Sequence, residues 1–452
     1  MKTVDIAVIG MGPGGEHVAG SLAERGLSVL GIERELVGGE CPYWGCVPTK
    51  MMVRAADALA EARRVDRLGG RVGDVVPDWG PVAARIRAEA TDNWDDRVAV
   101  DRFTDKGGSF VRGAGRVVSP TEVSVDDTTY AVRRGIVVAT GTTAAIPPIP
   151  GLSEVDYWTN RQAVAATELP GSIVVLGGGA IGCELSQVLA RFGVKVTIVE
   201  AAPRLLAVEE PEAGDILADV LRREGVTVHT GVAAERVRAD GDGVVVHLAD
   251  GSTVHGERLL VATGRRADPT AVGLTAVGVA EDARVAPVDD RCRVAPGVWA
   301  VGDVTGKGAF THVAMYQAGI VIRDILGEDG PPASYAALPR VTFTDPEVGA
   351  VGLTEAQARE QLAHVRVGSA SVPGTARGWI HKEGNEGIIK VVEDPERGVL
   401  VGATAMGPAG GEVLGALAVA VHAQVPVEQL RSMIYAYPTF HRGIEDALGA
   451  LA

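Results

Sequence analysis

Short apolar runs and glycine-rich turns alternate at the start of the chain. Residues 4–9 are mostly apolar and stop at Gly10, residues 16–25 are predicted to be helical, and residues 28–32 form a second apolar run. Short apolar runs bounded by turn residues are typical of β-strands, whereas the longer stretch between them suits a helix. The pattern therefore predicts a strand–helix–strand unit at the N-terminus.

The turn of this unit carries the pattern G-x-G-x-x-G. Gly10, Gly12 and Gly15 stand between the first strand and the helix, and Glu33 ends the second strand. Glycines here permit a tight turn and let the backbone approach a pyrophosphate, which the helix N-terminus then stabilises. An acidic residue at the tip of the second strand can accept hydrogen bonds from a ribose. Strand, helix and acid together predict a dinucleotide site.

The same pattern occurs a second time. Residues 172–176 and 195–199 are predicted strands on either side of a helix, and the second strand stops at Glu200. Each copy also has a later apolar strand that ends in Ala-Thr-Gly, at residues 136–141 and 259–264. The glycines of the second copy are Gly177, Gly179 and Gly182. Two such units predict two bound nucleotides.

The first copy is longer than the second, and the additional length contains Cys41 and Cys46. Residues four to five apart on a helix lie on roughly the same face. Pro42 and Gly45 favour an irregular first turn, so the two sulfurs could meet as a disulfide. A dithiol that closes and reopens is a two-electron relay, which needs an electron source beside it. Two unconnected buried cysteines are the plainer alternative.

Composition and charge narrow the class of protein. The 452 residues suffice for two to four domains, and a net charge of −15 argues against a nucleic-acid partner or an anionic membrane surface. We find no signal-peptide pattern and no apolar run of transmembrane length, so we expect a cytoplasmic protein without a membrane span. In a reducing compartment a close cysteine pair is expected to be catalytic rather than structural. The nine histidines form no metal-spaced cluster, and no metal site is predicted.

Two changes of character divide the chain. The proline-rich stretch 145–151 lies between the two nucleotide units and is typical of a domain boundary. From about residue 336, strand-like runs at 387–392 and 399–405 lead into a helical stretch at 411–423. This order predicts a third, α+β domain.

Together these motifs resemble the class I flavin-dependent pyridine nucleotide–disulfide oxidoreductases. The resemblance covers essentially the whole chain: two dinucleotide fingerprints, G-G-x-C-x4-C-x-P-T-K from Gly38, two Ala-Thr-Gly strand ends, Gly302-Asp303, and the opening of the third domain at 343–347. It implies an α/β fold with two Rossmann-like dinucleotide-binding domains and a C-terminal α+β dimerisation domain. The implied domains are residues 1–147 with 267–335 for FAD and the inserted dithiol helix, 148–266 for NAD(P), and 336–452 for dimerisation.

The resemblance also implies roles for individual residues. Cys46 would contact the flavin, Cys41 would face the substrate, and Lys50 would pair with Glu184 near the flavin, where a lysine stabilises the reduced ring. A solvated acid in the first turn of a helix is the plainer interpretation of Glu184. The residues implied to bind FAD are Gly10, Gly12, Gly15, Glu33, Gly39, Lys50, Ala114, Thr140, Gly141, Gly302, Asp303, Ala309 and His312. Those implied to bind NAD(P) are Gly177, Gly179, Ile181, Gly182, Glu200 and Gly264.

The choice of nicotinamide nucleotide rests on Glu200. A carboxylate at this position accepts from a free 2′-hydroxyl and repels a 2′-phosphate. The next three residues carry no positive charge, although Arg204 is near. We therefore expect NAD(H) to be favoured over NADP(H).

The C-terminal region departs from the family pattern. Members that reduce disulfides carry His-Pro-Thr-x-x-Glu, whereas this chain has Tyr437 at the histidine position and Arg442 at the glutamate position. A tyrosine ordinarily has a pKa of about 10, so it cannot stabilise the Cys41 thiolate or exchange protons as an imidazole does. His441 lies about one helical turn further on and could substitute, but a surface or packing histidine is the plainer interpretation.

These observations predict a homodimeric FAD enzyme with an active site shared between subunits, in which Tyr437 completes the partner's site. NADH, or NADPH, would supply two electrons that pass through the flavin and the Cys41–Cys46 pair. The small-molecule acceptor would be a metal ion, a quinone or an unusual thiol or disulfide. The alternatives are a dihydrolipoamide dehydrogenase-type enzyme served by His441, a flavin-only transhydrogenase or diaphorase with incidental cysteines, and a non-enzymatic flavoprotein.

Overall fold

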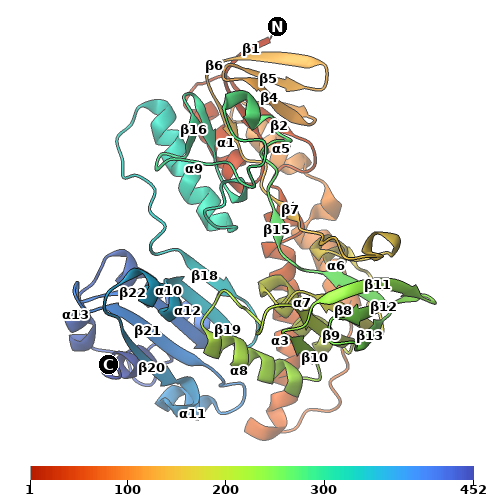
Figure 1. The fold of residues 1–452 in the computed structure, drawn as a ribbon, viewed down its shortest axis with the longest axis vertical. Coiled ribbons are helices and arrows are strands. Elements are labelled where there is room, and N and C mark those ends of the chain that lie inside the picture. Colours follow the sequence, from red (N-terminus) through yellow and green to blue (C-terminus); the bar gives the residue numbers. More distant parts are fainter. Residues whose placement is uncertain (1) are drawn as a thin grey trace. The chain divides into compact units, whose positions relative to one another are not determined.

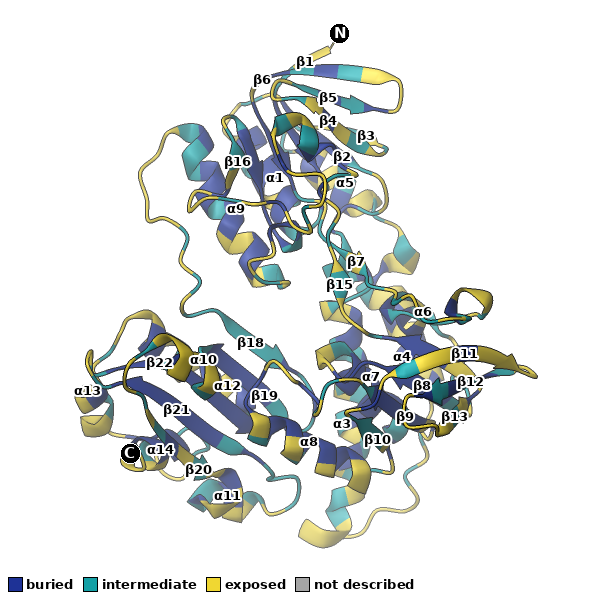
Figure 2. Cartoon of the chain, viewed as in Figure 1, coloured by how far each residue is buried: buried dark blue, intermediate teal, exposed yellow. Residues whose placement is uncertain are grey.

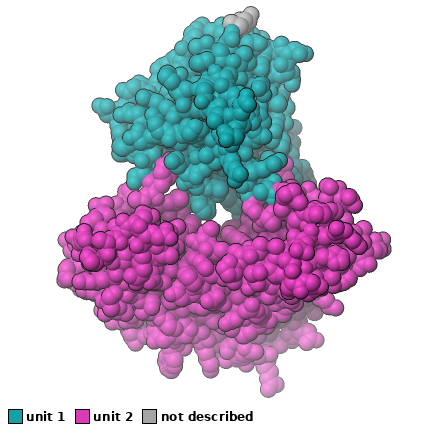
Figure 3. Space-filling model, viewed as in Figure 1, with its two compact units in different colours: residues 1–48, 84–145, 265–334 teal, residues 49–83, 146–264, 335–452 magenta. Residues whose placement is uncertain are grey.

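The computed structural model describes residues 2–452, which form two compact units (Figure 3). The chain enters and leaves each unit more than once. The first unit is Met1–Pro48, Ala84–Ala145 and Arg265–Ser334, and the second is Thr49–Ala83, Ile146–Gly264 and Tyr335–Ala452. None of the helices among residues 2–452 combines the length and the apolar character needed to cross a membrane.

The first unit is built on an eight-stranded sheet with β1 (Lys2–Ile9) inside it (Figure 1). β1 pairs in parallel with β2 (Val29–Glu33) and with β6 (Thr128–Val138). Ile6 and Val8 pack on one face against helices α1 (Pro13–Glu24) and α9 (Thr311–Leu326), and the alternate residues pack on the other face. A strand that is buried on both faces reads as a continuous apolar run, which is the pattern at the N-terminus.

Of the remaining strands, β16 (Arg293–Ala295), β17 (Val298–Ala300) and β3 (Ser109–Arg112) extend the sheet at its sides, whereas β4 (Gly115–Ser119) and β5 (Glu122–Val125) branch from β6. In Figure 2 the C-terminal halves of its central strands are dark blue, because helices cover one face and short strands and loops cover the other. A short ladder joins β7 (Thr143–Ala144) to β15 (Arg265–Arg266), and α5 (Arg97–Thr104) belongs to the same unit.

The second unit contains a repetition of the strand–helix–strand motif and a separate antiparallel sheet. Its parallel sheet has the order β10-β9-β8-β14, with α7 (Ala180–Arg191) following β8. A three-stranded meander, β11-β12-β13, packs on this sheet through residues such as Val237 and Val246. The strands are β8 (Ser172–Leu176), β9 (Lys195–Glu200), β10 (Thr227–Thr230), β11 (Ala234–Asp240), β12 (Gly243–Leu248), β13 (Thr253–Gly256) and β14 (Arg258–Val261), and the helices α4 (Gly80–Arg85), α6 (Asn160–Ala165) and α8 (Pro211–Arg223) accompany them.

The C-terminal part of the second unit is an antiparallel sheet with the order β18-β19-β22-β21-β20. Leu414 and Leu417 of α12 and Ile444 of α14 pack with the strands in one core. The strands are β18 (Pro339–Thr342), β19 (Glu347–Gly352), β20 (Arg366–Ser371), β21 (Ile388–Asp394) and β22 (Val399–Gly407), and the helices are α10 (Glu355–Gln361), α11 (Ala376–His381), α12 (Gly410–His422), α13 (Val427–Ser432) and α14 (Gly443–Gly449). The predicted α/β fold, with two Rossmann-like units and a C-terminal α+β domain, is confirmed.

The cysteine-containing segment has the irregular turn that Pro42 and Gly45 predict, but it forms two helices rather than one. Cys41 lies in the short helix α2 (Glu40–Tyr43), whereas Cys46 begins the separate helix α3 (Cys46–Leu68). The two cysteines therefore do not share one helical face. The helical conformation is interrupted at Trp44 and Gly45. The chain then passes from the first unit into the second within the first turn of α3.

The continuation of α3 in the second unit is held by ion pairs at one-heptad spacing. Lys50 pairs with Glu184 at 2.7 Å, and Asp57 pairs with Arg191 at 2.6 Å. One heptad further along α3, Arg64 pairs with Asp345 at 2.7 Å. Residues seven apart lie on one helical face, as do Glu184 and Arg191 of α7, whereas Asp345 lies outside that helix.

Arg191 is the centre of this network. Its side chain is 3% exposed and contacts carboxylate oxygens of Asp57, Glu224 and Asp345 at 2.6, 2.7 and 2.7 Å. Gln187 accepts from the Asp345 N–H and donates to the Asp345 carbonyl, both at 2.8 Å. The network thus fixes α3 and the 343–345 segment to α7.

Carboxylates outnumber guanidinium groups in this network. Arg191 and Arg64 provide two positive charges, whereas Asp57, Glu224, Asp345 and Glu61 provide four negative ones. Burial raises the pKa of Asp57 to about 6 in spite of the attraction from Arg191. In contrast, Arg191 and Arg64 outweigh burial at Asp345 and lower its pKa.

We predict that Asp57→Asn changes the dependence of stability on pH. Because native Asp57 binds its proton more tightly than the unfolded chain does, its contribution is full below the ordinary pKa of 3.8 and is lost as the pH rises through about 6. Between about pH 4 and pH 7, wild type should lose more of its free energy of unfolding than Asp57→Asn does, in urea titrations at each pH. Asp66→Asn, which removes an exposed carboxylate from the same helix, is the control. Equal slopes for Asp57→Asn and wild type would contradict the prediction.

Candidate functional site

The first glycine turn and Glu33 form one hydrogen-bonded assembly in the first unit. The two carboxylate oxygens of Glu33 accept from the N–H groups of Met11 and Glu35, each at 2.8 Å. Gly10 donates to the Ile32 carbonyl at 2.8 Å and has a φ of +93°, a conformation that favours glycine. The turn therefore holds the acid at the end of β2 next to the start of α1.

The N-terminus of α1 is open for a ligand. Gly12 is its N-cap, Pro13 is in the first turn, and no side chain caps the helix. A Cβ at Gly12 would meet nothing within 4 Å, whereas one at Gly10 would come within 2.5 Å of the Ala139 carbonyl oxygen. Uncapped N–H groups with free space in front suit a pyrophosphate, so the turn fits the adenosine diphosphate part of FAD.

The dithiol segment is attached to this turn. Gly38 donates to the Met11 carbonyl at 2.7 Å, and Gly39 has a φ of +67°. A Cβ at Gly39 would lie 2.9 Å from the Cα of Gly12, so only glycine permits this approach. The segment from Gly38 to Cys46 consequently starts beside the fingerprint glycines.

Cys41 and Cys46 lie close to each other and to Thr311. The hydrogen bond with Cys46, followed by burial, raises the pKa of the Cys41 thiol. Cys41 thus keeps its proton while it faces the other sulfur. The Cys46 sulfur lies 3.5 Å from the Thr311 hydroxyl at the start of α9. Cys46 is exposed, Cys41 is half-buried, and no disulfide joins them in the described residues 2–452.

Further FAD candidates lie at the carboxyl ends of the strands in the first unit. Asp303 follows β17, and its carboxylate accepts from the Thr142 hydroxyl at 2.9 Å, while burial raises its pKa. Arg265 donates to the Thr142 hydroxyl at 2.8 Å and lies 3.5 Å from Glu40. Thr140 and Gly141 directly precede Thr142, and Gly302 directly precedes Asp303. Sequence reasoning missed Thr142 and Arg265, since each follows an Ala-Thr-Gly mark without belonging to it.

Three other candidates are Ala309, His312 and Ala114. Ala309 and His312 stand on either side of the 310–311 pair at the start of α9, and the His312 ring stacks on Phe310 at 5.1 Å. Ala114 lies between β3 and β4 and is exposed. All three belong to the first unit.

Lys50 and Glu184 form a buried-acid ion pair in the second unit. One carboxylate oxygen of Glu184 lies 2.7 Å from Lys50 Nζ, and the other accepts from the Phe343 N–H at 2.8 Å. Glu184 is 7% exposed, so it is not a solvated acid of the first helical turn. Lys50 Nζ also lies 4.6 Å from the centre of the Phe343 ring. These contacts fix the direction of the lysine.

The second glycine turn repeats the geometry of the first. Glu200 accepts from the N–H groups of Gly178 and Ala202 at 2.5 and 2.6 Å. Gly179 is the uncapped N-cap of α7, and a Cβ there would meet nothing within 4 Å. Ile181 and Gly182 lie in the first turn of that helix, and Gly264 follows β14 with a φ of +111°.

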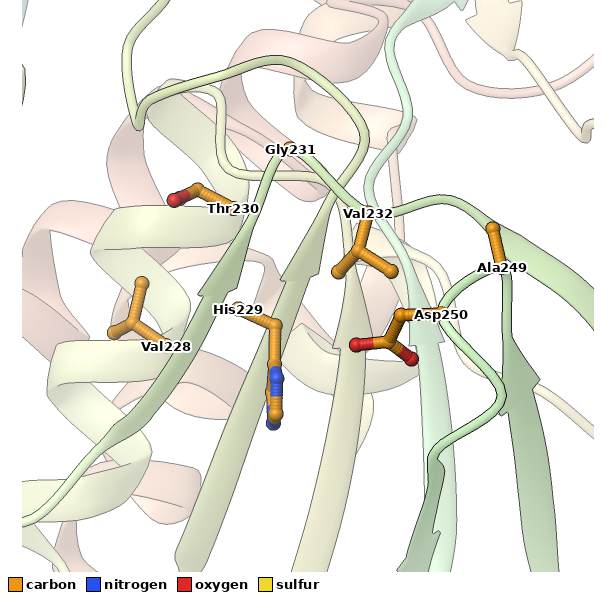
Figure 4. Close-up of a pocket in the computed structure, with 7 residues that line it drawn as sticks. All are labelled: Val228, His229, Thr230, Gly231, Val232, Ala249 and Asp250. Atoms are coloured by element: carbon orange, nitrogen blue, oxygen red, sulfur yellow. The ribbon is translucent and has the colours of Figure 1, made fainter.

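Arg204, the one cation near Glu200 in the sequence, is used inside its own loop. Its guanidinium donates to the carbonyls of Ala207 and Glu209 at 3.0 and 3.4 Å. A pocket beside this region lies between the end of β10 and the turn after β12, where the chain passes through Gly231 (Figure 4). Its lining residues are Val228, His229, Thr230, Gly231, Val232, Ala249 and Asp250, none of which belongs to the glycine turn.

One acidic cluster has the spacing of a metal site within residues 2–452. It consists of Glu210, Glu212 and Glu355. Lys390 Nζ lies 2.8 Å from a carboxylate oxygen of each of them and is 4% exposed. An ammonium group therefore occupies the position that a cation would take.

The C-terminal candidates are exposed in the single chain. Tyr437 is 70% exposed, and the Arg442 guanidinium lies 5.4 Å from the centre of its ring and pairs with Glu445 at 3.0 Å. The His441 ring packs 6.3 Å from Tyr435, and its Nε2 lies 3.5 Å from the Thr439 hydroxyl. Met433 and Ile434 nearby are also exposed, at 46% and 96%. Apolar side chains of this size in water suggest a surface that another chain covers.

Comparisons with known proteins agree with this geometry. Residues 4–318 match the family model described as pyridine nucleotide-disulphide oxidoreductase, and residues 338–448 match the dimerisation domain of that family. The chain is 35% identical to the dihydrolipoyl dehydrogenase of Chlorobaculum tepidum, over 98% of this chain and 96% of that protein. It is 33% identical to a mercuric reductase of Streptomyces lividans, over 98% and 95% of the two chains.

A solved structure shows the same arrangement of elements. The Cu(II) complex of the HOCl-induced flavoprotein disulfide reductase RclA from Escherichia coli has a TM-score of 0.86 to this chain, with 27% identity over 99% of each chain. The match to a dimerisation domain supports a homodimer, and family membership supports FAD as the cofactor. With two fingerprint turns, a cysteine pair beside the first of them and family models that match almost its whole length, this chain belongs to the pyridine nucleotide–disulfide oxidoreductases and is an enzyme of that family.

Proposed function

We propose that the chain is an NADH-dependent flavoenzyme that uses the Cys41–Cys46 dithiol to reduce a thiophilic metal ion, with Cu(II) as the first acceptor to test. The observation that carries this proposal is an intact, accessible cysteine pair in a chain that has Tyr437 and Arg442 in place of the imidazole and carboxylate. FAD, when bound, supplies the two-electron chemistry that links a nicotinamide to a disulfide. Residues 1–147 with 267–335 would hold FAD, 148–266 would hold NADH, and 336–452 would form the dimer of a cytoplasmic enzyme.

The missing imidazole affects the two kinds of acceptor differently. Exchange with a disulfide substrate needs a stabilised thiolate and a group that returns a proton to the leaving sulfur. A metal ion binds sulfur directly and needs no proton, and soft thiolate ligands favour Cu(I) over Cu(II). The dithiol and two Cu(II) ions would give the disulfide, two Cu(I) ions and two protons. NADH would then restore the dithiol.

The relatives support two acceptor classes. The mercuric reductase and the Cu(II) complex of RclA favour a metal ion. The dihydrolipoyl dehydrogenase of Chlorobaculum tepidum favours a disulfide acceptor, which is our second candidate. His441 would have to serve that second reaction, and in the single chain it packs against Tyr435. Tyr437 of one subunit is proposed to complete the dithiol site of its partner.

Cys41→Ser should abolish most of the metal reduction. We expect at least a ten-fold fall in NADH-dependent Cu(I) formation, measured anaerobically with a Cu(I)-specific chelator, because the acceptor loses its sulfur ligand. Anaerobic titration of wild type with NADH should give a long-wavelength charge-transfer absorbance. Reduction of a flavin-directed dye by NADH should persist in the variant and is the internal control. Undiminished Cu(I) formation by Cys41→Ser would refute a role for the dithiol.

The double variant Tyr437→His, Arg442→Glu should gain lipoamide reduction. A positioned imidazole–carboxylate pair typically contributes about 10²- to 10⁴-fold to such proton transfers. We expect a rise of at least ten-fold in NADH-dependent lipoamide reduction at pH 7, with Arg442→Glu alone as the control. High lipoamide activity in wild type would instead favour the second candidate.

Nucleotide preference should follow Glu200. Its carboxylate is held by two backbone N–H groups, and the Arg204 guanidinium is directed to carbonyls of its own loop. We expect kcat/KM for NADH to exceed that for NADPH by at least about ten-fold, since a 2′-phosphate would meet the carboxylate. Glu200→Gln should lower the ratio of kcat/KM for NADH to kcat/KM for NADPH, mainly by raising the value for NADPH. Equal values for both nucleotides in wild type would be inconsistent with this assignment.

A further inference from the structure

Three consecutive residues of the first unit adopt a left-handed backbone conformation. Asp92, Asn93 and Trp94 have φ values of +47°, +55° and +59°, and none of them is glycine. They follow a π-helical turn, Ile86–Ala90. L-residues rarely adopt this region, and least often in succession. Such segments persist only where surrounding contacts hold them, and they concentrate at functional sites.

The residue that precedes the turn satisfies the backbone of the π-helical segment. Thr91 is 1% exposed. Its hydroxyl donates to the carbonyls of Ile86 and Arg87 at 3.0 and 3.3 Å. The turn itself is closed by hydrogen bonds from the Trp94 N–H to the Thr91 carbonyl at 2.8 Å and from the Asp95 N–H to the Asp92 carbonyl at 3.0 Å. The direction in which Trp94 leaves the backbone is thereby fixed.

The turn places Trp94 on the break between the two cysteines. The Trp94 ring stacks on Trp44, with centroids 5.2 Å apart and planes inclined by 23°. Its indole Nε1–H donates to the Tyr43 carbonyl at 3.3 Å. Tyr43 is the last residue of α2, where carbonyl groups have no partner within the helix. Trp94 therefore contacts Tyr43, the last residue of α2, and Trp44, the first residue of the break.

The residues after the turn hold the other end of the segment. The Asp96 carboxylate accepts from the Val37 N–H at 2.6 Å and pairs with Arg112 at 2.6 Å. Val37 immediately precedes the Gly38-Gly39 pair that leads to Cys41. Residues 94–96 thus contact the cysteine segment on both sides of Cys41, at Val37 before it and at Tyr43 after it.

We propose that Trp94 is a positioning residue of the redox relay, which the strained turn presses against Trp44 so that Cys41 stays within bonding reach of Cys46. This inference rests on the proposed function only in that the dithiol must work as a relay. The identity of the acceptor does not enter it. Trp94 does not itself contact a sulfur atom in any contact described above, so it acts through the backbone of Tyr43 and Trp44.

The consequence is a shift in the dithiol–disulfide equilibrium. Closing the disulfide forms one S–S bond and releases two electrons and two protons, which an oxidised thiol buffer takes up. Without the contacts of Trp94, Cys41 would spend less time near Cys46 in the dithiol state. The effective concentration of one thiol at the other would fall, and the disulfide would become easier to reduce.

The test uses the FAD-loaded enzyme in dithiothreitol redox buffers. The disulfide fraction is measured by quenching, alkylation of free thiols and mass spectrometry of the peptides that contain Cys41 and Cys46. In Trp94→Leu, which removes the ring stack and the N–H donor, we expect the equilibrium constant for the disulfide to fall at least ten-fold, or about 30 mV for a two-electron couple. Trp94→Phe keeps a ring for stacking and removes the donor, so a smaller fall in the same direction is expected.

Trp79→Phe is the matched control. Trp79 likewise donates from Nε1 to a backbone carbonyl, that of Ala166 at 2.9 Å, and packs on an aromatic ring, that of Phe192 at 5.0 Å. The Trp79→Phe substitution should leave the dithiol–disulfide equilibrium constant unchanged. Melting temperature and flavin content are recorded for every variant. Should Trp94→Leu fail to fold, Trp94→Phe alone decides the question.

The outcomes separate this inference from the proposed function. An equilibrium constant within about two-fold of wild type in a folded Trp94→Leu or Trp94→Phe variant would overturn the positioning role. If the equilibrium constant for the disulfide falls in these variants but wild type does not reduce Cu(II), the inference is supported and the metal acceptor is rejected. A shift of similar size in Trp79→Phe would show a general loss of packing and would also overturn it.

Discussion

The break in the chain between Cys41 and Cys46 is the constraint on which the redox centre depends. In a continuous helix, five residues correspond to a rotation of about 500° and a rise of about 7.5 Å, which directs the two side chains away from each other. A disulfide needs Cα atoms no more than about 7 Å apart and Cβ atoms that face each other. Ending α2 at Tyr43 and starting α3 at Cys46 removes this conflict. The contacts of Gly38, Val37 and Tyr43 anchor the segment, and ion pairs hold the helix that follows.

The anchors come from both directions along the chain. Before the break, Gly38 and Gly39 attach the segment to the fingerprint turn, and Asp96 holds Val37. After the break, α3 carries Lys50, Asp57 and Arg64 into ion pairs with the second unit's own residues. A helix held at three successive heptads cannot rotate about its axis without breaking charged contacts. These contacts hold the part of α3 that belongs to the second unit, from Thr49 onward.

Sequence reasoning succeeded where the chemistry is local and failed where it depends on partners far along the chain. The fingerprint turns could be predicted because strand, glycines, helix and acid lie within about thirty residues, and the structure joins them by backbone hydrogen bonds to Glu33 and Glu200. Cys41 and Cys46 were identified for the same reason, and the irregular turn predicted from Pro42 and Gly45 is present at Trp44 and Gly45, although the two cysteines do not share one helical face. Thr142, Arg265 and Arg191 act through partners many residues away, and no local pattern marks them. Trp94 was missed because a left-handed turn of Asp, Asn and Trp leaves no signature in the composition.

The energetics of the left-handed turn at residues 92–94 indicate that the turn serves to position Trp94 rather than to stabilise the fold. Three non-glycine residues in the left-handed region cost on the order of 1–2 kcal/mol each. A stacked aromatic pair contributes about 0.5–1.5 kcal/mol and a neutral hydrogen bond about 1 kcal/mol. The hydrogen bond from the Val37 N–H to the Asp96 carboxylate contributes about 1.5–3 kcal/mol, and the part-exposed pair of Asp96 with Arg112 about 0.2–1 kcal/mol. These sums are of similar size, so the turn gains the fold little or nothing overall. An ordinary right-handed turn would avoid the strain but would direct Trp94 elsewhere and leave the Tyr43 carbonyl without its donor. The one thing that only the strained conformation provides is an indole fixed on the break between the two cysteines.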